Sequence, residues 1–379
     1  MSLPEKRFEK QRFNPRGVGQ PVRGMPPLPP TARHVLAVRL DTLGDVLMTG
    51  PALRALRAAA PGRRLTLLTS PPGAAVARLM PEVDETIVYD APWMKRERGA
   101  GSAPDEQLLA SLRERSFDAA VIFTVYTQSP LPAALMCHLA GVPRRAAHCR
   151  ENPYALLTDW LPEPEPEDIQ RHEVRRQLDL AGSLGAPAPD APLRVEVPDV
   201  ARAGVRAMLA EAGVERPWAV VHPGATAPSR RYPPELWGRA CRALAEDHGL
   251  RLVFTGDPAE AEVATRVRAL AGEPGPSLAG RLSVDELAAL IEAAPLLMAG
   301  NTGPVHLAAA VGTPVVDLYA LTNPQHTPWM VPSRVLSNDV PCRWCYRSVC
   351  PEGHHLCLRG VAPERLVAAA LELLAERGG

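Results

Sequence analysis

The stretch Leu296–Leu318, LLMAGNTGPVHLAAAVGTPVVDL, decides how the fold of this chain is interpreted. Residues 296–299 are apolar and suit a buried strand, and Gly300 begins a tight turn that leads to Pro304. From Pro304 to Gly312 the apolar residues suit a buried helix, and proline is tolerated in a first helical turn because its missing N–H has no intrahelical partner there. A strand–turn–helix unit directs several backbone N–H groups to one point, which suits a phosphate. An ordinary capped helix in an α/β domain is an equally good interpretation of this stretch by itself.

The composition is that of a globular protein. The chain has 379 residues, of which 46% are hydrophobic and 22% are charged, and this length allows two domains. Lys+Arg and Asp+Glu both number 42, so we expect no overall basic field and no nucleic-acid partner. No apolar run is long and uncharged enough to cross a bilayer. Without an export signal, the seven cysteines are expected to lie in a reducing cytosol.

Residues 1–33 differ from the rest of the chain. They carry seven Lys or Arg residues against two Glu residues, with prolines throughout, and are predicted to form a disordered tail. A basic, flexible arm could lie on anionic lipid, and a plain extension without a partner is an equally good interpretation.

After the tail, apolar runs alternate with helical patterns in two series, which predicts βαβ units on parallel sheets. In the first series the strands are expected at residues 34–39, 65–69, 86–89 and 119–124, and the helices at 44–59, 107–115 and 131–140. A connector at 162–168 and a helix at 173–184 follow. In the second series the strands are expected at 218–222, 251–255, 296–299 and 314–318, and the helices at 234–247, 259–270 and 284–293.

Two doubly wound halves in tandem are therefore the expected α/β fold, with ligands in the crevice beyond the carboxyl ends of the strands. The predicted domains are residues 34–198 and 199–361. A last helix within residues 362–379 has no strand after it and is expected to pack near the domain junction.

Four segments of the chain, in this order, resemble glycosyltransferase family 9, the lipopolysaccharide heptosyltransferases. They are RLDTLGD at 39–45, HPGAT at 222–226 running into RRYP at 230–233, GDPAE at 256–260, and TGPVH at 302–306. The likeness covers roughly residues 34–377. It implies the GT-B fold, in which two Rossmann-like domains face a central cleft, the first binding the acceptor and the second the nucleotide-sugar. It also implies an inverting, metal-independent transfer of a sugar, typically heptose from ADP-heptose, to a growing lipopolysaccharide core.

An inverting transfer needs one base that takes the proton of the acceptor hydroxyl while the diphosphate leaves from the opposite face. Asp45 matches the aspartate of the family's Gly-Asp motif and is the predicted base, with Asp41 in reserve; a helix cap is the structural alternative for Asp45. Arg39 matches a basic family position, so the resemblance assigns Arg39 and Asp41 to the acceptor side. His172 lies where the family often has a histidine and is assigned to acceptor or interdomain contacts.

The leaving diphosphate needs fixed positive groups, because its charge grows in the transition state. Many nucleotide-sugar enzymes use a metal ion on an Asp-x-Asp pair, and the sequence contains no such pair. The turn at Thr302 and Gly303 supplies amides instead. The resemblance places Arg230 where the family usually has lysine, and Thr226 where it has a hydroxyl near the phosphates. Arg231 is an alternative to Arg230, and both arginines could also be solvated loop residues.

Three further residues are assigned to the donor by the resemblance. Glu260 matches an acid that reaches the ribose hydroxyls, although Asp257 is nearer the strand end and a charged first helical turn would explain both. His306 recurs in the family, while a histidine in an apolar helix is more often a core residue. Asn301 stands where the family commonly has an aspartate that contacts the sugar; asparagine keeps an acceptor oxygen but loses the charge and gains two donors.

Four cysteines near the C-terminus are spaced Cys-x2-Cys-x4-Cys-x6-Cys and enclose two histidines. They are Cys342, Cys345, Cys350 and Cys357, with His354 and His355 inside. This spacing suits a small zinc site, but a loop of unliganded thiols is the favoured interpretation. No cofactor other than the nucleotide-sugar co-substrate is expected.

The sequence thus predicts a cytoplasmic glycosyltransferase that works on a glycolipid acceptor at the inner face of a membrane. A nucleotide-sugar 2-epimerase of the same architecture is one alternative, and it would need further acid–base residues in the cleft. A non-catalytic nucleotide-sugar-binding module is the other, suggested by Asn301. The oligomeric state is not indicated by any feature of the sequence.

Overall fold

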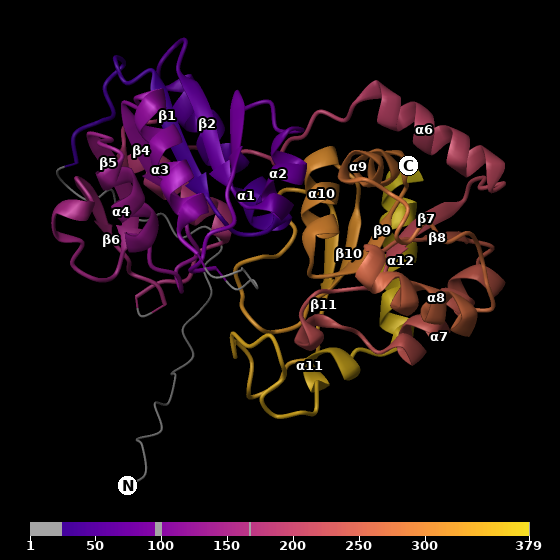
Figure 1. Cartoon of the computed structure of the whole chain (residues 1–379). Coiled ribbons are helices and arrows are strands. Elements are labelled where there is room, and N and C mark those ends of the chain that lie inside the picture. Colours follow the sequence, from indigo (N-terminus) through magenta and orange to yellow (C-terminus); the bar gives the residue numbers. More distant parts are fainter. Residues whose placement is uncertain (1–24, 95–100, 167, 379) are drawn as a thin grey trace, which may run out of the picture.

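Two parallel sheets, each covered by helices on both faces, make up the structure (Figure 1). It is a computed structural model that describes residues 25–94, 101–166 and 168–378. The first sheet has the strand order β3-β2-β1-β4-β5-β6, and the second has the order β11-β10-β9-β7-β8. Every paired neighbour in both sheets runs parallel. The predicted tandem of doubly wound α/β domains is confirmed.

The first sheet is made by six short strands, and helices cover both of its faces. Its strands are β1 (His34–Arg39), β2 (Arg64–Thr69), β3 (Glu85–Val88), β4 (Ala119–Ile122), β5 (Arg144–Cys149) and β6 (Asp159–Pro162). Helices α1 (Leu43–Ala58), α2 (Pro71–Ala77) and α5 (Glu173–Ser183) share one apolar core with this sheet. Helices α3 (Ala103–Arg115) and α4 (Leu131–Leu139) pack in the core on the other face. Strand β4 is apolar throughout, and β1 is apolar from Val35 to Val38, because both faces of the sheet are buried.

The second sheet is covered in the same way. Its strands are β7 (Trp218–His222), β8 (Arg251–Phe254), β9 (Leu297–Gly300), β10 (Val315–Leu318) and β11 (Ser333–Leu336). One face carries α6 (Asp199–Glu211), α9 (Val284–Ala293) and α10 (Gly303–Val311). The other carries α7 (Pro234–Glu246), α8 (Ala261–Leu270) and α12 (Pro363–Gly378). Short helical turns lie at η1 (Tyr154–Leu156), η2 (Pro228–Arg230), η3 (Pro258–Glu260) and α11 (Leu356–Arg359).

The two halves share one apolar core. Leu47 and Leu53 of α1 belong to the same buried cluster as Val305 and Leu307 of α10. Figure 1 shows α1 and α2 of the first half beside α9 and α10 of the second. The strand order reverses between β1 and β4 in the first sheet and between β7 and β9 in the second. Segments that follow β1, β7 and β9 are therefore at the two switch points, where ligands bind in open α/β sheets.

The predicted disordered tail is wrong for its last nine residues, 25–33, while residues 1–24 lie outside the described part. Leu28 is 7% exposed and its N–H donates to the Leu184 carbonyl at 2.8 Å. The buried Arg63 donates through Nε to the Ala32 carbonyl at 3.0 Å. Apolar burial and these hydrogen bonds hold the segment against the first domain.

The last helix also differs from the prediction that it packs near the domain junction. Leu366, Ala370 and Leu373 of α12 are buried in the core beneath the second sheet, together with Trp237 of α7. Its apolar side thus completes the cover of its own sheet. Five elements that the sequence did not suggest, α2, α6, β5, β6 and β11, are short or have polar residues among the apolar ones. None of the helices within the described residues is long and apolar enough to cross a bilayer.

Candidate functional site

The N-termini of α1 and α10 meet between the two sheets, and glycine makes this contact possible. A Cβ on Gly44, in the first turn of α1, would lie 2.6 Å from Cδ2 of His306. A Cβ on Gly303, at the start of α10, would lie 3.1 Å from Cδ2 of Leu43. Both turns therefore approach closely, and the positive ends of the two helix dipoles lie near each other at the switch points, where the ligand crevice is predicted. Asp45 belongs to the first of these turns and Thr302 is the N-cap residue of the second.

Arg39, the last residue of β1, is fully buried among three carboxylates. Its NH1 donates to Glu173 Oε1 at 2.9 Å, its NH2 donates to Asp45 Oδ1 at 3.2 Å, and its Nε lies 2.9 Å from Asp41 Oδ2. A buried guanidinium needs such partners, because an unpaired charge in the interior is strongly disfavoured. The assignment of Arg39 to acceptor binding does not fit this geometry, since the side chain has no exposed surface. Arg39 is instead an internal partner of Asp45.

Asp45 is held as an ionised carboxylate at the edge of the crevice, with its side chain 16% exposed. Its Oδ2 accepts hydrogen bonds from the Thr42 hydroxyl at 2.9 Å and the Thr42 N–H at 3.3 Å. Burial, the largest single effect, raises its pKa, but the charge of Arg39, the nearby histidines and the Thr42 hydrogen bond together lower the pKa to about 2. Asp45 thus has a partial capping role, the structural alternative considered above, and its role as the base stays a prediction.

Asp41 and Glu173 complete the group around Arg39. Burial raises the pKa of Asp41 to about 6 even though Arg39 opposes this, and Gln128 Nε2 donates to Asp41 Oδ1 at 2.6 Å. Glu173 is 0% exposed; burial raises its pKa most, but the charges of Arg39, Arg176 and His326 together lower the pKa overall. Asp41 is 8% exposed, so Asp45 is the more accessible of the two candidate bases.

The loops after β7 and β9 carry the residues predicted to bind the donor. Arg230 NH1 lies 3.5 Å from the Asn301 carbonyl, so this guanidinium faces the turn at the start of α10. Among the described residues, no side chain caps the N-terminus of α10. Arg231 points elsewhere: its Nε donates to the Ala225 carbonyl at 2.7 Å and its NH2 to the Thr226 carbonyl at 3.4 Å. The structure thus brings Arg230, rather than Arg231, to the predicted phosphate turn, and Thr226 is exposed.

Several buried polar atoms at this turn have no hydrogen-bond partner within the described chain. They include both amide atoms of Asn301, which is 3% exposed, Nδ1 of His306, and both carboxylate oxygens of Asp317 on β10. Burial lowers the pKa of His306 to about 3 and raises that of Asp317 well above its ordinary value, although the charge of Arg230 opposes the second shift. Buried groups of this kind are unusual, and they mark the turn as a candidate ligand site.

The carboxylate of Glu260, which the resemblance assigns to the ribose hydroxyls, already has hydrogen-bond partners within the protein. Its Oε2 lies 3.2 Å from His222 Nε2 and accepts from the Asp257 N–H at 3.1 Å. In return, the Asp257 carboxylate accepts from the Glu260 N–H at 2.9 Å, which makes a capping box. The pKa of Glu260 is lowered overall. Burial alone would raise it, but the hydrogen bond with His222 and the other nearby groups have the larger combined effect. The helix-start interpretation of both acids is confirmed by these contacts, and the ribose role stays a prediction.

The assignment of His172 to interdomain contacts is the one that the structure supports. His172 is 2% exposed; its Nε2 lies 2.9 Å from the Thr327 carbonyl, and its ring centroid lies 4.5 Å from that of Trp329. Thr327 and Trp329 belong to residues 323–329, which we call the docking segment because it leaves the second sheet after β10 and contacts the first domain. The buried position of His172 leaves little surface for an acceptor.

Sequence reasoning missed four residues of the site: Gln128, Glu173, Asp317 and His326. Gln128 follows β4, which lies across the switch point from β1, so its position after a predicted strand could have indicated it. Glu173 directly follows His172, a residue that the resemblance had already assigned. Asp317 was hidden inside an apolar strand. His326 lies in the docking segment; burial lowers its pKa despite the nearby carboxylates of Asp45 and Glu173, and its Nε2 has no hydrogen-bond partner in the described chain.

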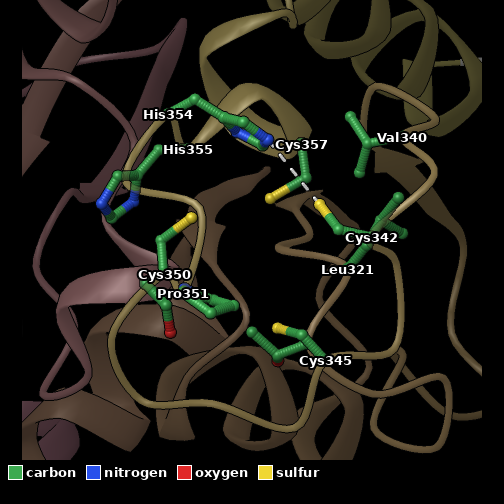
Figure 2. A pocket seen from close by; sticks show the side chains of 11 residues that line it. Leu321, Val340, Cys342, Cys345, Cys350, Pro351, His354, His355 and Cys357 are labelled. Carbon is green, nitrogen blue, oxygen red and sulfur yellow. Dashed lines mark hydrogen bonds between the residues drawn. The ribbon is translucent and has the colours of Figure 1, made fainter. Parts of the chain in front are cut away.

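The cysteine-rich loop forms a separate pocket (Figure 2). The four cysteines Cys342, Cys345, Cys350 and Cys357 line it together with His354 and His355. Cys342 Sγ lies 3.8 Å from His354 Nε2, and Figure 2 shows Cys345 and Cys350 elsewhere around the pocket. Within the described residues, no three His, Cys, Asp or Glu side chains come together as a metal site would require. The possible zinc site therefore stays a prediction.

Comparisons with known proteins agree on one family. The family model described as "Glycosyltransferase family 9 (heptosyltransferase)" matches residues 106–356. Lipopolysaccharide heptosyltransferase 2 of Escherichia coli K12 is 26% identical over 354 residues, which are 90% of this chain and 98% of that protein. The crystal structure of a family 9 glycosyltransferase from Veillonella parvula has a TM-score of 0.76 at 21% identity, over 91% of this chain and 98% of that one. The structure of the E. coli heptosyltransferase WaaC with ADP-2-deoxy-2-fluoro heptose has a TM-score of 0.60 at 20% identity, over 91% and 100%.

Proposed function

Because the chain belongs to glycosyltransferase family 9, the heptosyltransferases, we propose that it transfers heptose from ADP-heptose to a lipopolysaccharide-core acceptor. The chain is thus a glycosyltransferase, and its fold is GT-B. Similarity to lipopolysaccharide heptosyltransferases over nine-tenths of the chain supports the reaction class. The ADP-sugar analogue in the WaaC structure supports the choice of donor. Family membership favours transfer over 2-epimerisation and over a non-catalytic binding module.

The proposed reaction is an inverting displacement. An acceptor hydroxyl attacks C1 of the sugar, Asp45 takes the hydroxyl proton, and the bond from C1 to the diphosphate breaks on the opposite face. The observation that carries this proposal is the position of Asp45: an ionised, partly exposed carboxylate at a helix N-terminus that packs against the N-terminus of α10. Asp41 has a pKa nearer to neutrality but is less accessible and is bound on both oxygens.

The departing diphosphate is proposed to bind at the turn before α10. The backbone N–H groups after Thr302 and the guanidinium of Arg230 would offset its growing charge, without a divalent ion. Asn301, with both amide atoms unpartnered in the described chain, is proposed to bind the sugar, and Glu260 the ribose. The first domain is proposed to bind the acceptor, at the cytoplasmic face of a membrane. No helix of the described chain spans a membrane, so a glycolipid acceptor would have to be approached from the surface.

Replacing Asp45 by Asn tests this function. Asp45→Asn keeps the shape of the side chain but removes the base, so transfer should fall by about 10²–10⁴-fold while the affinity for ADP-heptose changes little. Transfer is measured from ADP-heptose to heptose-free core lipid, with magnesium or with EDTA, and donor binding by calorimetry. Asp339→Asn, at an exposed aspartate paired with Arg343, is the matched control.

Transfer by Asp45→Asn at the wild-type rate would contradict the role of this base. If EDTA abolished transfer by the wild type, a metal-independent reaction would be contradicted, but the proposed choice of ADP-heptose as donor would not. Failure of ADP-heptose to bind the wild type would contradict the choice of donor.

A further inference from the structure

The docking segment, residues 323–329, fixes the second domain to the start of α5. The Gln325 carbonyl accepts a hydrogen bond from the Glu173 N–H at 2.9 Å, and Gln325 Nε2 donates to Glu165 Oε2 at 3.3 Å. Trp329 packs on His172 and donates through Nε1 to the Ala191 carbonyl at 2.9 Å. Gln325 is 2% exposed and Trp329 is 8% exposed, so water does not compete strongly for these bonds.

The same residue, Glu173, is bound to the first domain's site through its side chain. Its Oε1 accepts from Arg39 NH1 at 2.9 Å and from Gln177 Nε2 at 2.5 Å. Arg39 in turn holds Asp45 at 3.2 Å. An unbroken series of bonds therefore leads from Gln325 of the second domain through Glu173 and Arg39 to Asp45.

Glu173 matters in this series because three carboxylates share one guanidinium. With Glu173 ionised and in place, NH1 of Arg39 is fixed, and only NH2 is directed at Asp45. Without that charge, NH1 keeps at most a weaker hydrogen bond to a neutral side chain, and the buried guanidinium can turn toward Asp41 or Asp45. The orientation of Asp45 then depends on a residue that touches no part of the crevice surface.

We propose that Glu173 is a positioning residue through which the docked second domain sets the orientation of Asp45. This inference rests on the proposed function, in which Asp45 is the base and the second domain carries the donor. Docking of the donor-bearing second domain on α5 and alignment of Asp45 are then coupled. Transfer would be favoured only when the domains are arranged as they are here.

The test uses Glu173→Gln, which keeps the size of the side chain and removes its charge. We expect kcat to fall at least tenfold while KM for the donor stays within twofold, because donor contacts are untouched. Glu163→Gln is the matched control: Glu163 is as deeply buried and accepts from Arg176 Nε at 3.0 Å, but it has no contact with Arg39. This control should keep the wild-type kcat.

Trp329→Leu tests the other end of the series without changing any charge. It should lower kcat by a similar factor, and the double variant Glu173→Gln, Trp329→Leu should lose little more than either single variant, because both act on one series of bonds. Losses that multiply in the double variant would overturn the inference, and so would a wild-type kcat in Glu173→Gln.

Hydrogen–deuterium exchange supplies a readout that does not need transfer. Residues 40–47 should exchange faster in Glu173→Gln and in Trp329→Leu than in the wild type or in Glu163→Gln. Unchanged exchange in both variants would overturn the inference. If the wild type transfers no heptose but exchange changes as expected, the proposed function fails and the positioning role of Glu173 stands.

Discussion

Arg39 shows how neighbours decide the role of a residue. In the sequence it is a cation at the end of a strand, where a solvated side chain or a ligand contact is the usual expectation. In the structure it is fully buried, because Asp41, Asp45 and Glu173 surround it. Asp41 and Asp45 are close in the sequence, but Glu173 comes from an element more than one hundred residues away, so this pairing could not be read from the motif.

His306 is predicted to make the protein sensitive to acid. Burial lowers its pKa to about 3, so the folded protein keeps it neutral, whereas the unfolded chain takes up the proton near pH 6.5. The unfolded state therefore binds more protons below pH 6.5, and the free energy of unfolding falls as the pH drops from 6.5 to 4. His306→Asn should reduce this fall by about 1–3 kcal/mol, as measured by urea denaturation at several pH values.

The control for this prediction is His248→Asn, which changes an exposed histidine and should keep the wild-type pH dependence. A pH dependence of His306→Asn that matches the wild type would show that His306 is protonated in the folded protein.

At the scale of elements, the contact of α1 with α10 depends on Gly44. A Cβ there would lie 2.6 Å from the buried ring of His306, so Gly44→Ala should destabilise the protein by about 1–3 kcal/mol through overpacking. The control is Gly50→Ala in the same helix, where a Cβ meets only the flexible end of Met80 at 3.3 Å. It should be neutral or stabilising, because alanine suits a helix better than glycine. Equal midpoints of urea unfolding for the two variants would contradict the prediction.

The cysteine-rich loop is expected to bind no stoichiometric zinc. Its four thiols line one pocket, but within the described residues no three ligand side chains converge. Mass spectrometry of the purified protein should find less than one zinc ion per chain, and a thiol reagent should modify the loop cysteines without a chelator. One tightly held zinc ion per chain, released only when these thiols are modified, would establish the metal site instead.

The helices and strands that could be predicted from the sequence are those with a continuous apolar run or a clear helical spacing of apolar residues. The prediction for residues 296–318 matched the observed bounds of the strand, turn and helix closely, because β9 is apolar throughout and α10 is apolar except for His306. Strand β5, with two arginines, a histidine and a cysteine, was missed because its burial depends on pairing with β4 and β6. The predicted connector at 162–168 contains Glu163 and Glu165, which are buried against Arg171 and Arg176. Such pairing is a tertiary effect that a local pattern does not contain.

At the scale of the whole molecule, the continuous core makes the two domains depend on each other. Buried residues of α1 and α10 belong to a single apolar cluster, and the docking segment adds further contacts. We therefore predict one cooperative unfolding transition in urea, with coincident midpoints by circular dichroism and by tryptophan fluorescence. Two separated transitions would show that the halves unfold independently and that the shared cluster contributes little.

Helix α12 returns to its own sheet, so in the described parts of the chain the backbone passes from one sheet to the other a single time, between α5 and α6. The enzyme could therefore be split: a chain cut between α5 and α6 would give two polypeptides, each with one complete sheet. Co-expressed, the fragments would reassociate through the apolar faces of α1 and α10. Produced separately, each would expose those faces to water and tend to aggregate.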